Sequence, residues 1–147
     1  MNCMSGKCFV DTDILVYAHD RSAGAKHLRA QIVLERLWDS GWGVISTQVL
    51  HELCIHLCRN ASNPPPIEEV SRLIRDYSAW EVVPNTPEGV LAALEIVMRH
   101  KVHFWDALIV EAAQRAGVSV LYSEHLATQP RYGAIQVVNP LLDPVAQ

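Results

Sequence analysis

Short apolar segments that alternate with helical stretches are the feature that most limits what this chain can fold into. Between the apolar segments, hydrophobic residues recur at helical spacing, and Gly117 follows the last such stretch as a typical helix stop. Strands that alternate with helices favour an α/β fold with a mainly parallel sheet, here of about five strands. The predicted strands are 8–11, 43–45, 80–83, 118–122 and 135–138, and the predicted helices are 25–38, 49–59, 67–77, 87–99 and 105–116.

The composition is that of one globular unit. The chain has 147 residues, of which 50% are hydrophobic and 19% charged, so we expect a single domain over residues 1–147. No apolar run approaches the roughly 20 residues that cross a bilayer, and no secretory leader is evident, so we expect a cytoplasmic protein. The net charge of −4 counts against a nucleic-acid partner but does not exclude RNA, because a bound cation would offset carboxylates.

Two carboxylates follow the first predicted strand. Asp11 and Asp13 are two positions apart, directly after an apolar run. A carboxylate at a strand end is costly unless it is paired or binds a cation, and ligand sites in parallel sheets form beyond the carboxyl ends of strands. The alternative is helix capping, which fits Asp13 better if a helix begins at Ile14.

Further polar residues recur in comparable places. Glu52 lies in the helix after the second strand, where it is either an exposed helix residue or half-buried between leucines. Asp106 lies in an apolar segment at a helix start, where it suits either the helix dipole or a cation. Ser123 and Glu124 follow the fourth strand and can also begin a turn. Acidic side chains that converge repel one another unless a divalent cation binds them, and oxygen ligands favour Mg²⁺ or Mn²⁺.

The order of these segments resembles the PIN-domain family, above all the VapC-like toxin ribonucleases of toxin–antitoxin modules. By this resemblance Asp11, Glu52 and Asp106 stand at the three acids of the family, and Asp13 falls where the family often has Asn. The matching segments are 8–17, 46–52, 105–109, 121–126 and 137–141.

The resemblance implies a fold, an activity and partners. The fold would be a three-layer α/β/α sandwich, and the activity a metal-dependent hydrolysis of RNA phosphodiester bonds. Asp11 and Asp106 would hold Mg²⁺ or Mn²⁺ directly or through water, Glu52 would hold metal-bound water and act as general base, and Asp13 would support the site from its edge. The implied partners are an RNA substrate, a cognate antitoxin whose tail places a basic residue in the acidic cleft, and a second copy in a homodimer.

The chain departs from the family after the fourth strand. Where a fourth Asp is usual, this chain has His125, preceded by Ser123 and Glu124. Either Glu124 turns inward as a metal ligand or His125 takes the role, and a neutral imidazole suits Mn²⁺ better than Mg²⁺.

Three other readings stay open. Asp11-Thr12-Asp13 also resembles the start of haloacid-dehalogenase-type phosphatases, although the late acidic pair and a convincing lysine of that class are missing. A PIN domain that lost its chemistry through His125 would only bind RNA or a partner protein. Finally, Cys54 and Cys58 lie one helical turn apart, and they are either buried thiols or part of a zinc site with His51.

Overall fold

The computed structural model describes residues 6–59 and 63–142, and its centre is a six-stranded sheet. The strand order is β3-β2-β1-β4-β6-β5, and every neighbouring pair is parallel except β5 and β6, which are antiparallel. The strands are β1 (Cys8–Val10), β2 (Gly43–Ser46), β3 (Glu81–Val83), β4 (Val120–Tyr122), β5 (Arg131–Tyr132) and β6 (Ile135–Val138). The predicted α/β fold with a mainly parallel sheet is confirmed, with one short strand more than expected.

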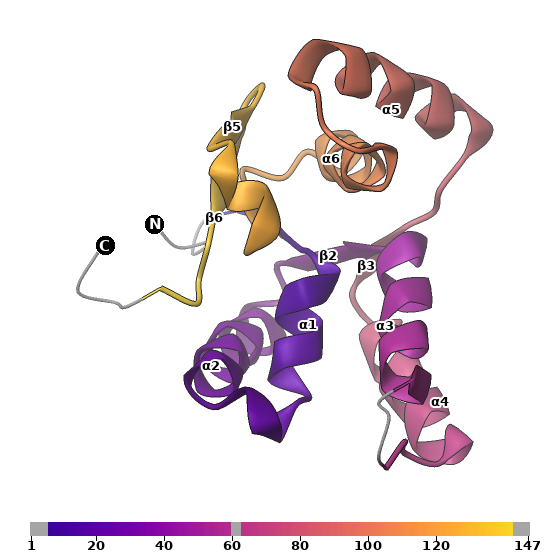
Figure 1. Cartoon of the computed structure of the whole chain (residues 1–147), viewed down its shortest axis with the longest axis vertical. Coiled ribbons are helices and arrows are strands. Elements are labelled where there is room, and N and C mark those ends of the chain that lie inside the picture. The colour runs from indigo at the N-terminus through magenta and orange to yellow at the C-terminus, as the bar shows by residue number, and fades with distance from the viewer. Residues whose placement is uncertain (1–5, 60–62, 143–147) are drawn as a thin grey trace.

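Helices cover both faces of this sheet. In Figure 1, α1 and α2 lie on one side of the sheet and α5 and α6 on the other, so the predicted three layers are present. The helices are α1 (Thr12–Ala18), α2 (Ala25–Ser40), α3 (Thr47–Arg59), α4 (Ile67–Tyr77), α5 (Pro87–His100) and α6 (Phe104–Ala116), with short 3₁₀ turns η1 (Arg21–Ala23) and η2 (His125–Thr128). No helix in residues 6–59 and 63–142 is both long and apolar enough to span a membrane.

The central strand brings the polar residues together. All three residues of β1 are fully buried, as expected for a strand covered by helices on both faces. Val10 pairs with Tyr122 of the parallel strand β4, so the next residues, Asp11 and Ser123, leave the sheet side by side at the same edge. The Asp11 backbone N–H also donates to the Tyr122 carbonyl at 2.9 Å.

The start of α1 differs from the prediction. The helix begins at Thr12, two residues earlier than Ile14, so its N-cap is Asp11, and Asp13 lies in the first turn. The preference for Asp13 as the capping residue was therefore wrong. The helix stop at Gly117 is confirmed, because Gly117 is the left-handed C-cap of α6.

Candidate active site

Asp11 is a buried carboxylate held by two hydrogen bonds. The residue as a whole is only 2% exposed. Oδ1 accepts from the Thr12 backbone N–H at 2.7 Å, and Oδ2 accepts from the Ser123 hydroxyl at 2.8 Å. Burial, and then the nearby charge of Asp13, raise the pKa of Asp11 to about 7, although both hydrogen bonds and His125 act in the opposite direction. The fold thus holds an ionisable group that gains from a nearby positive charge.

Asp13 faces the chain segment after β4. Its Oδ2 accepts from the backbone N–H groups of Glu124 and His125 at 3.0 and 3.3 Å, and lies 3.1 Å from His125 Nδ1. Its other oxygen, Oδ1, is buried and has no hydrogen-bond partner among the residues that the structure describes. A buried carboxylate oxygen without a partner is costly, which makes it a favourable position for a cation.

His125 bridges the acids that come from different elements. Its Nε2 lies 2.8 Å from Oδ1 of Asp106, in the first turn of α6, while Nδ1 faces Asp13 and lies 3.6 Å from Oδ2 of Asp11. The hydrogen bonds to Asp106 and Asp13 raise the pKa of His125 to about 11. In this arrangement the imidazole is a cation among three carboxylates.

Glu52 reaches the same pocket from α3. Its Oε1 accepts from the buried Thr12 hydroxyl at 2.6 Å, so α1 positions a residue that lies far from it in the chain. A pocket of about 330 Å³ opens between these elements, and it is lined by Asp11, Thr12, Asp13, Val16, Tyr17, Glu52, His56, Asp106 and His125. The structure therefore places all three predicted catalytic acids, together with Asp13 and His125, around one cavity.

Glu124 is directed elsewhere. Its Oε1 accepts from the Tyr17 hydroxyl at 2.7 Å, its Oε2 pairs with Lys26 Nζ at 2.7 Å, and the Lys26 ammonium lies 5.0 Å from the centre of the Tyr17 ring. The bond to Lys26, and then that to Tyr17, lower the pKa of Glu124. Glu124 does not line the acidic pocket, and only its backbone contacts Asp13.

Several residues of this region escaped the sequence analysis. Thr12 positions Glu52, Tyr17 and Lys26 hold Glu124, and His56 lines the pocket from α3. The position of Thr12 between the two aspartates was the one available hint. The contacts of Lys26 and His56 depend on how α2 and α3 pack against α1, which no local pattern reveals.

The side chains fit a divalent cation. Ligand atoms of Asp11, Asp13 and His125 all lie within 4.8 Å of one another, and within the described residues no other such group is found. Asp13, a member of this group, also has the unpartnered oxygen Oδ1, and carboxylate oxygens are the donors that Mg²⁺ and Mn²⁺ prefer. Cys54 and Cys58 are free thiols that do not form such a group with His51 in the described part of the chain. Cys54 is only half-buried and Cys58 is exposed, so the prediction of buried thiols was wrong.

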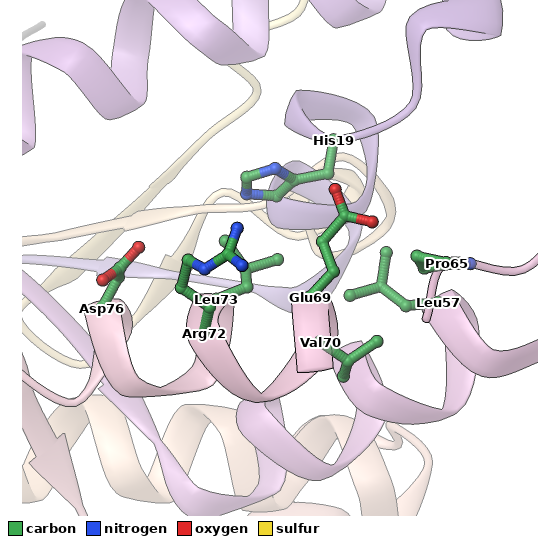
Figure 2. Close-up of a pocket in the computed structure, with 8 residues that line it drawn as sticks. All are labelled: His19, Leu57, Pro65, Glu69, Val70, Arg72, Leu73 and Asp76. Atoms are coloured by element: carbon green, nitrogen blue, oxygen red, sulfur yellow. The ribbon is translucent and has the colours of Figure 1, made fainter. Parts of the chain in front are cut away.

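A second pocket, of about 260 Å³, lies along α4 and has a different character (Figure 2). Apolar side chains of α3 and α4, among them Leu57, Val70 and Leu73, line it together with charged groups of α4 and His19. His19 already forms a hydrogen bond with the Tyr77 hydroxyl, which lies 2.8 Å from its Nε2. The acidic pocket is therefore the better candidate for chemistry.

Comparison with known structures supports the fold. Mycobacterium tuberculosis VapC20, described as a sarcin–ricin loop cleaving toxin, matches with a TM-score of 0.64 and 22% identity over 88% of this chain and 99% of that chain. A toxin–antitoxin complex from Klebsiella pneumoniae matches with 0.65 and 20% over 91% and 98%. DNA-bound VapBC from Salmonella typhimurium matches with 0.65 and 18% over 92% and 98%.

Sequence comparison gives the family directly. No curated protein sequence matches the chain, but the model of the PIN domain matches residues 8–125. This range runs from the first residue of β1 to His125, and so includes every residue that lines the acidic pocket. The chain belongs to the PIN domain family.

Proposed function

We propose that this chain is a metal-dependent endoribonuclease that hydrolyses RNA phosphodiester bonds, and that it is the toxin of a toxin–antitoxin pair. The observation that carries the proposal is the convergence of Asp11, Glu52 and Asp106 on one pocket of a PIN domain. Asp13 adds a fourth carboxylate to the same pocket. Membership of this family leaves the phosphatase alternative without support.

The cation, Mg²⁺ or Mn²⁺, would be held at the group formed by Asp11, Asp13 and His125, with Asp106 beside it. When bound, such an ion polarises the scissile phosphate and lowers the pKa of an attacking water. The hydrogen bonds from Thr12 and Ser123 hold the Asp11 carboxylate in the orientation in which it would bind the ion.

Glu52 is suited to the general base role. One of its carboxylate oxygens is fixed by Thr12, so the side chain is oriented while the group as a whole is only half-buried. A carboxylate oriented in this way accepts a proton from water at the edge of the pocket. Asp13 stabilises the segment that carries His125 through the backbone N–H groups of Glu124 and His125.

The partners are proposed on the same basis. An antitoxin tail that inserts a lysine or arginine into the acidic pocket would compete with the cation and with RNA, because several carboxylates attract any cationic group. We also propose that the chain is one cytoplasmic domain and forms a homodimer. Sedimentation analysis should then give a mass near twice 16.4 kDa, and a monomer would contradict the dimer alone.

The test is cleavage of purified RNA, including a sarcin–ricin loop oligonucleotide, in the presence of Mn²⁺, Mg²⁺ or EDTA. We expect cleavage with either ion, none with EDTA, and none for Asp11→Asn. Asp39→Asn, at an exposed position of α2, is the matched control and should cleave normally. Cleavage that persists in Asp11→Asn or in EDTA would rule the proposal out.

One observation favours a second candidate. His125 already neutralises the acids by bonding to both Asp13 and Asp106, which would suit a PIN domain that binds RNA or a partner without cutting. In that case RNA binding should be measurable while no product forms at any concentration of Mn²⁺.

A further inference from the structure

The imidazole of His125 has two sides with different surroundings. The Nδ1 side faces Oδ2 of Asp13 at 3.1 Å and Oδ2 of Asp11 at 3.6 Å. The Nε2 side faces Oδ1 of Asp106 at 2.8 Å. Asp106 is therefore connected to the other two aspartates through the ring of His125, and it lies outside the group whose ligand atoms are within 4.8 Å of one another.

We propose that His125 binds the cation through Nδ1 together with Asp11 and Asp13, and that Asp106 acts on the cation through the imidazole as a positioning residue. This inference rests on the metal site of the proposed function. It differs from the arrangement that the family resemblance implies, in which Asp106 itself holds the ion.

The geometry matches a common feature of histidine metal ligands. A histidine that ligates through one nitrogen nearly always donates its other N–H to a carboxylate or carbonyl, which fixes the ring and makes the ligating nitrogen more basic. Asp106 is in place to accept from Nε2 in this way. Its own position is fixed in the first turn of α6, where the helix dipole favours a negative charge.

The backbone holds the ring in the same place. The N–H groups of Glu124 and His125 both donate to Asp13, and the Leu126 N–H donates to the Ser123 hydroxyl at 3.1 Å, where η2 begins. Ser123 in turn donates to Asp11. His125 is thus anchored to both carboxylates that would share the ion with it.

Coordination by Nδ1 requires that this nitrogen release its proton. The cation then takes over the interaction with Asp11 and Asp13 that the proton had provided, so metal binding releases one proton and becomes tighter as the pH rises. A nitrogen ligand in place of an oxygen also changes which ion is preferred. Imidazole suits transition-metal ions better than Mg²⁺, so we expect the site to prefer Mn²⁺ over Mg²⁺, and to lose much of this preference in His125→Asp.

The first test is pulsed EPR of Mn²⁺ bound to the full chain, which detects a nitrogen nucleus bonded to the ion. We expect a ¹⁴N coupling in the wild type that is lost in His125→Gln and kept in His56→Gln. His56 is the matched control because it lines the same pocket but lies outside the ligand group. A wild-type spectrum without nitrogen coupling, or one that His56→Gln abolishes, would overturn the assignment.

The second test asks whether Asp106 acts through His125. Mn²⁺ affinity is measured for Asp106→Asn, His125→Gln and the double variant, each first checked for folding by circular dichroism. Loss of a carboxylate behind a metal-bound histidine typically costs 10- to 100-fold in affinity, so we expect about a 10-fold loss for Asp106→Asn in the wild type. In the His125→Gln background the same change should cost less than about 2-fold, because there is no imidazole left to position.

Two outcomes separate this inference from the proposed function. If the losses in the double variant simply add, Asp106 binds the ion independently and the inference is wrong, while a metal-dependent nuclease remains. If Asp11→Asn binds Mn²⁺ as tightly as the wild type, the metal site itself is wrong, and with it both the proposed function and this inference.

Discussion

At the scale of single residues, Asp11 has opposite effects on stability and on metal binding. The residue is buried and lies two positions from another acid, so in metal-free protein its ionised form is unfavourable. Since burial raises the pKa of Asp11 to about 7 from an ordinary value of 3.8, the penalty is fully present above pH 7. It declines as the folded carboxyl takes up a proton at lower pH.

Asp11→Asn should therefore stabilise the metal-free fold. The amide retains the capping oxygen and removes the buried charge, so we expect a gain of about 1–3 kcal/mol in EDTA at pH 8. This corresponds to an increase in Tm of roughly 2–12 °C for a chain of this size, and the gain should shrink towards pH 5. Asp39→Asn should leave the Tm unchanged. A lower Tm for Asp11→Asn in EDTA would mean that the lost hydrogen bonds outweigh burial.

Glu124 gives a second prediction at this scale. Its carboxylate binds Tyr17 and Lys26 rather than lining the pocket, so Glu124→Gln should leave the metal-induced rise in Tm unchanged. In EDTA the variant should also differ little from the wild type, because partly exposed ion pairs contribute little. Loss of the metal-induced rise would mean that Glu124 turns inward when the ion binds.

The residues of the site were easier to predict than their contacts. Asp11, Glu52 and Asp106 follow from strand ends, helix starts and the family pattern. The choice of Asp13 over Asp11 as helix cap was wrong, because the cap depends on where α1 begins. The backbone hydrogen bond from Asp11 to Tyr122 keeps Asp11 at the end of the sheet, and α1 begins at the next residue. The ring of His125 could not be placed from sequence, because its partners come from α1 and α6.

At the scale of elements, the close contact of α5 with α6 depends on a glycine, which has no side chain. Gly89, in the first turn of α5, lies against Glu111 of α6, and a Cβ there would be 2.6 Å from Glu111 Oε1. Glu111 cannot simply move away, because it is buried and binds Arg115 through both of its oxygens at 2.8 and 2.9 Å. Arg115 also donates to the Pro84 carbonyl at 2.8 Å.

Gly89→Ala should therefore destabilise the fold, although alanine is the better helix former by about 1 kcal/mol. We expect a net loss of up to about 2 kcal/mol, because overpacking a closed contact typically costs 1–3 kcal/mol and the gain in helix propensity offsets about 1 kcal/mol of it. Urea denaturation measures this change in the free energy of unfolding. In a Glu111→Ala background the same change should be neutral or stabilising. A destabilisation of equal size in both backgrounds would place the cause in the helix itself.

Most of the helices and strands could be predicted from hydrophobic spacing. Where the prediction failed, the failure has a physical reason. α4 and β6 begin and end where expected, while other boundaries move by a few residues where capping decides them. β5 was missed because its two residues are too few to carry an alternating pattern. It forms only because Gly133, with a φ of 61°, turns the chain back so that Tyr132 pairs with Ile135.

At the scale of the whole molecule, cation binding should be visible as global stability. An ion that binds only the folded chain stabilises it by about 2.7 kcal/mol at 100 times its Kd. This should raise the Tm by roughly 5–10 °C for a chain of this length. A titration with Mn²⁺ followed by EDTA measures this rise and its reversal. Asp11→Asn should show no rise, and a rise of equal size in that variant would indicate binding elsewhere.

The pairing of β1 with β4 also determines when the pocket can exist during synthesis. The Ser123–Asp11 and His125–Asp13 contacts each join residues 112 positions apart. At about 5–20 residues per second, a ribosome adds His125 roughly 6–22 seconds after Asp13. Throughout that interval the first acids of the nascent chain have no counterpart to close the pocket. The proposed nuclease is therefore incomplete until His125 has been translated, and a shorter nascent chain lacks the residues that close the pocket.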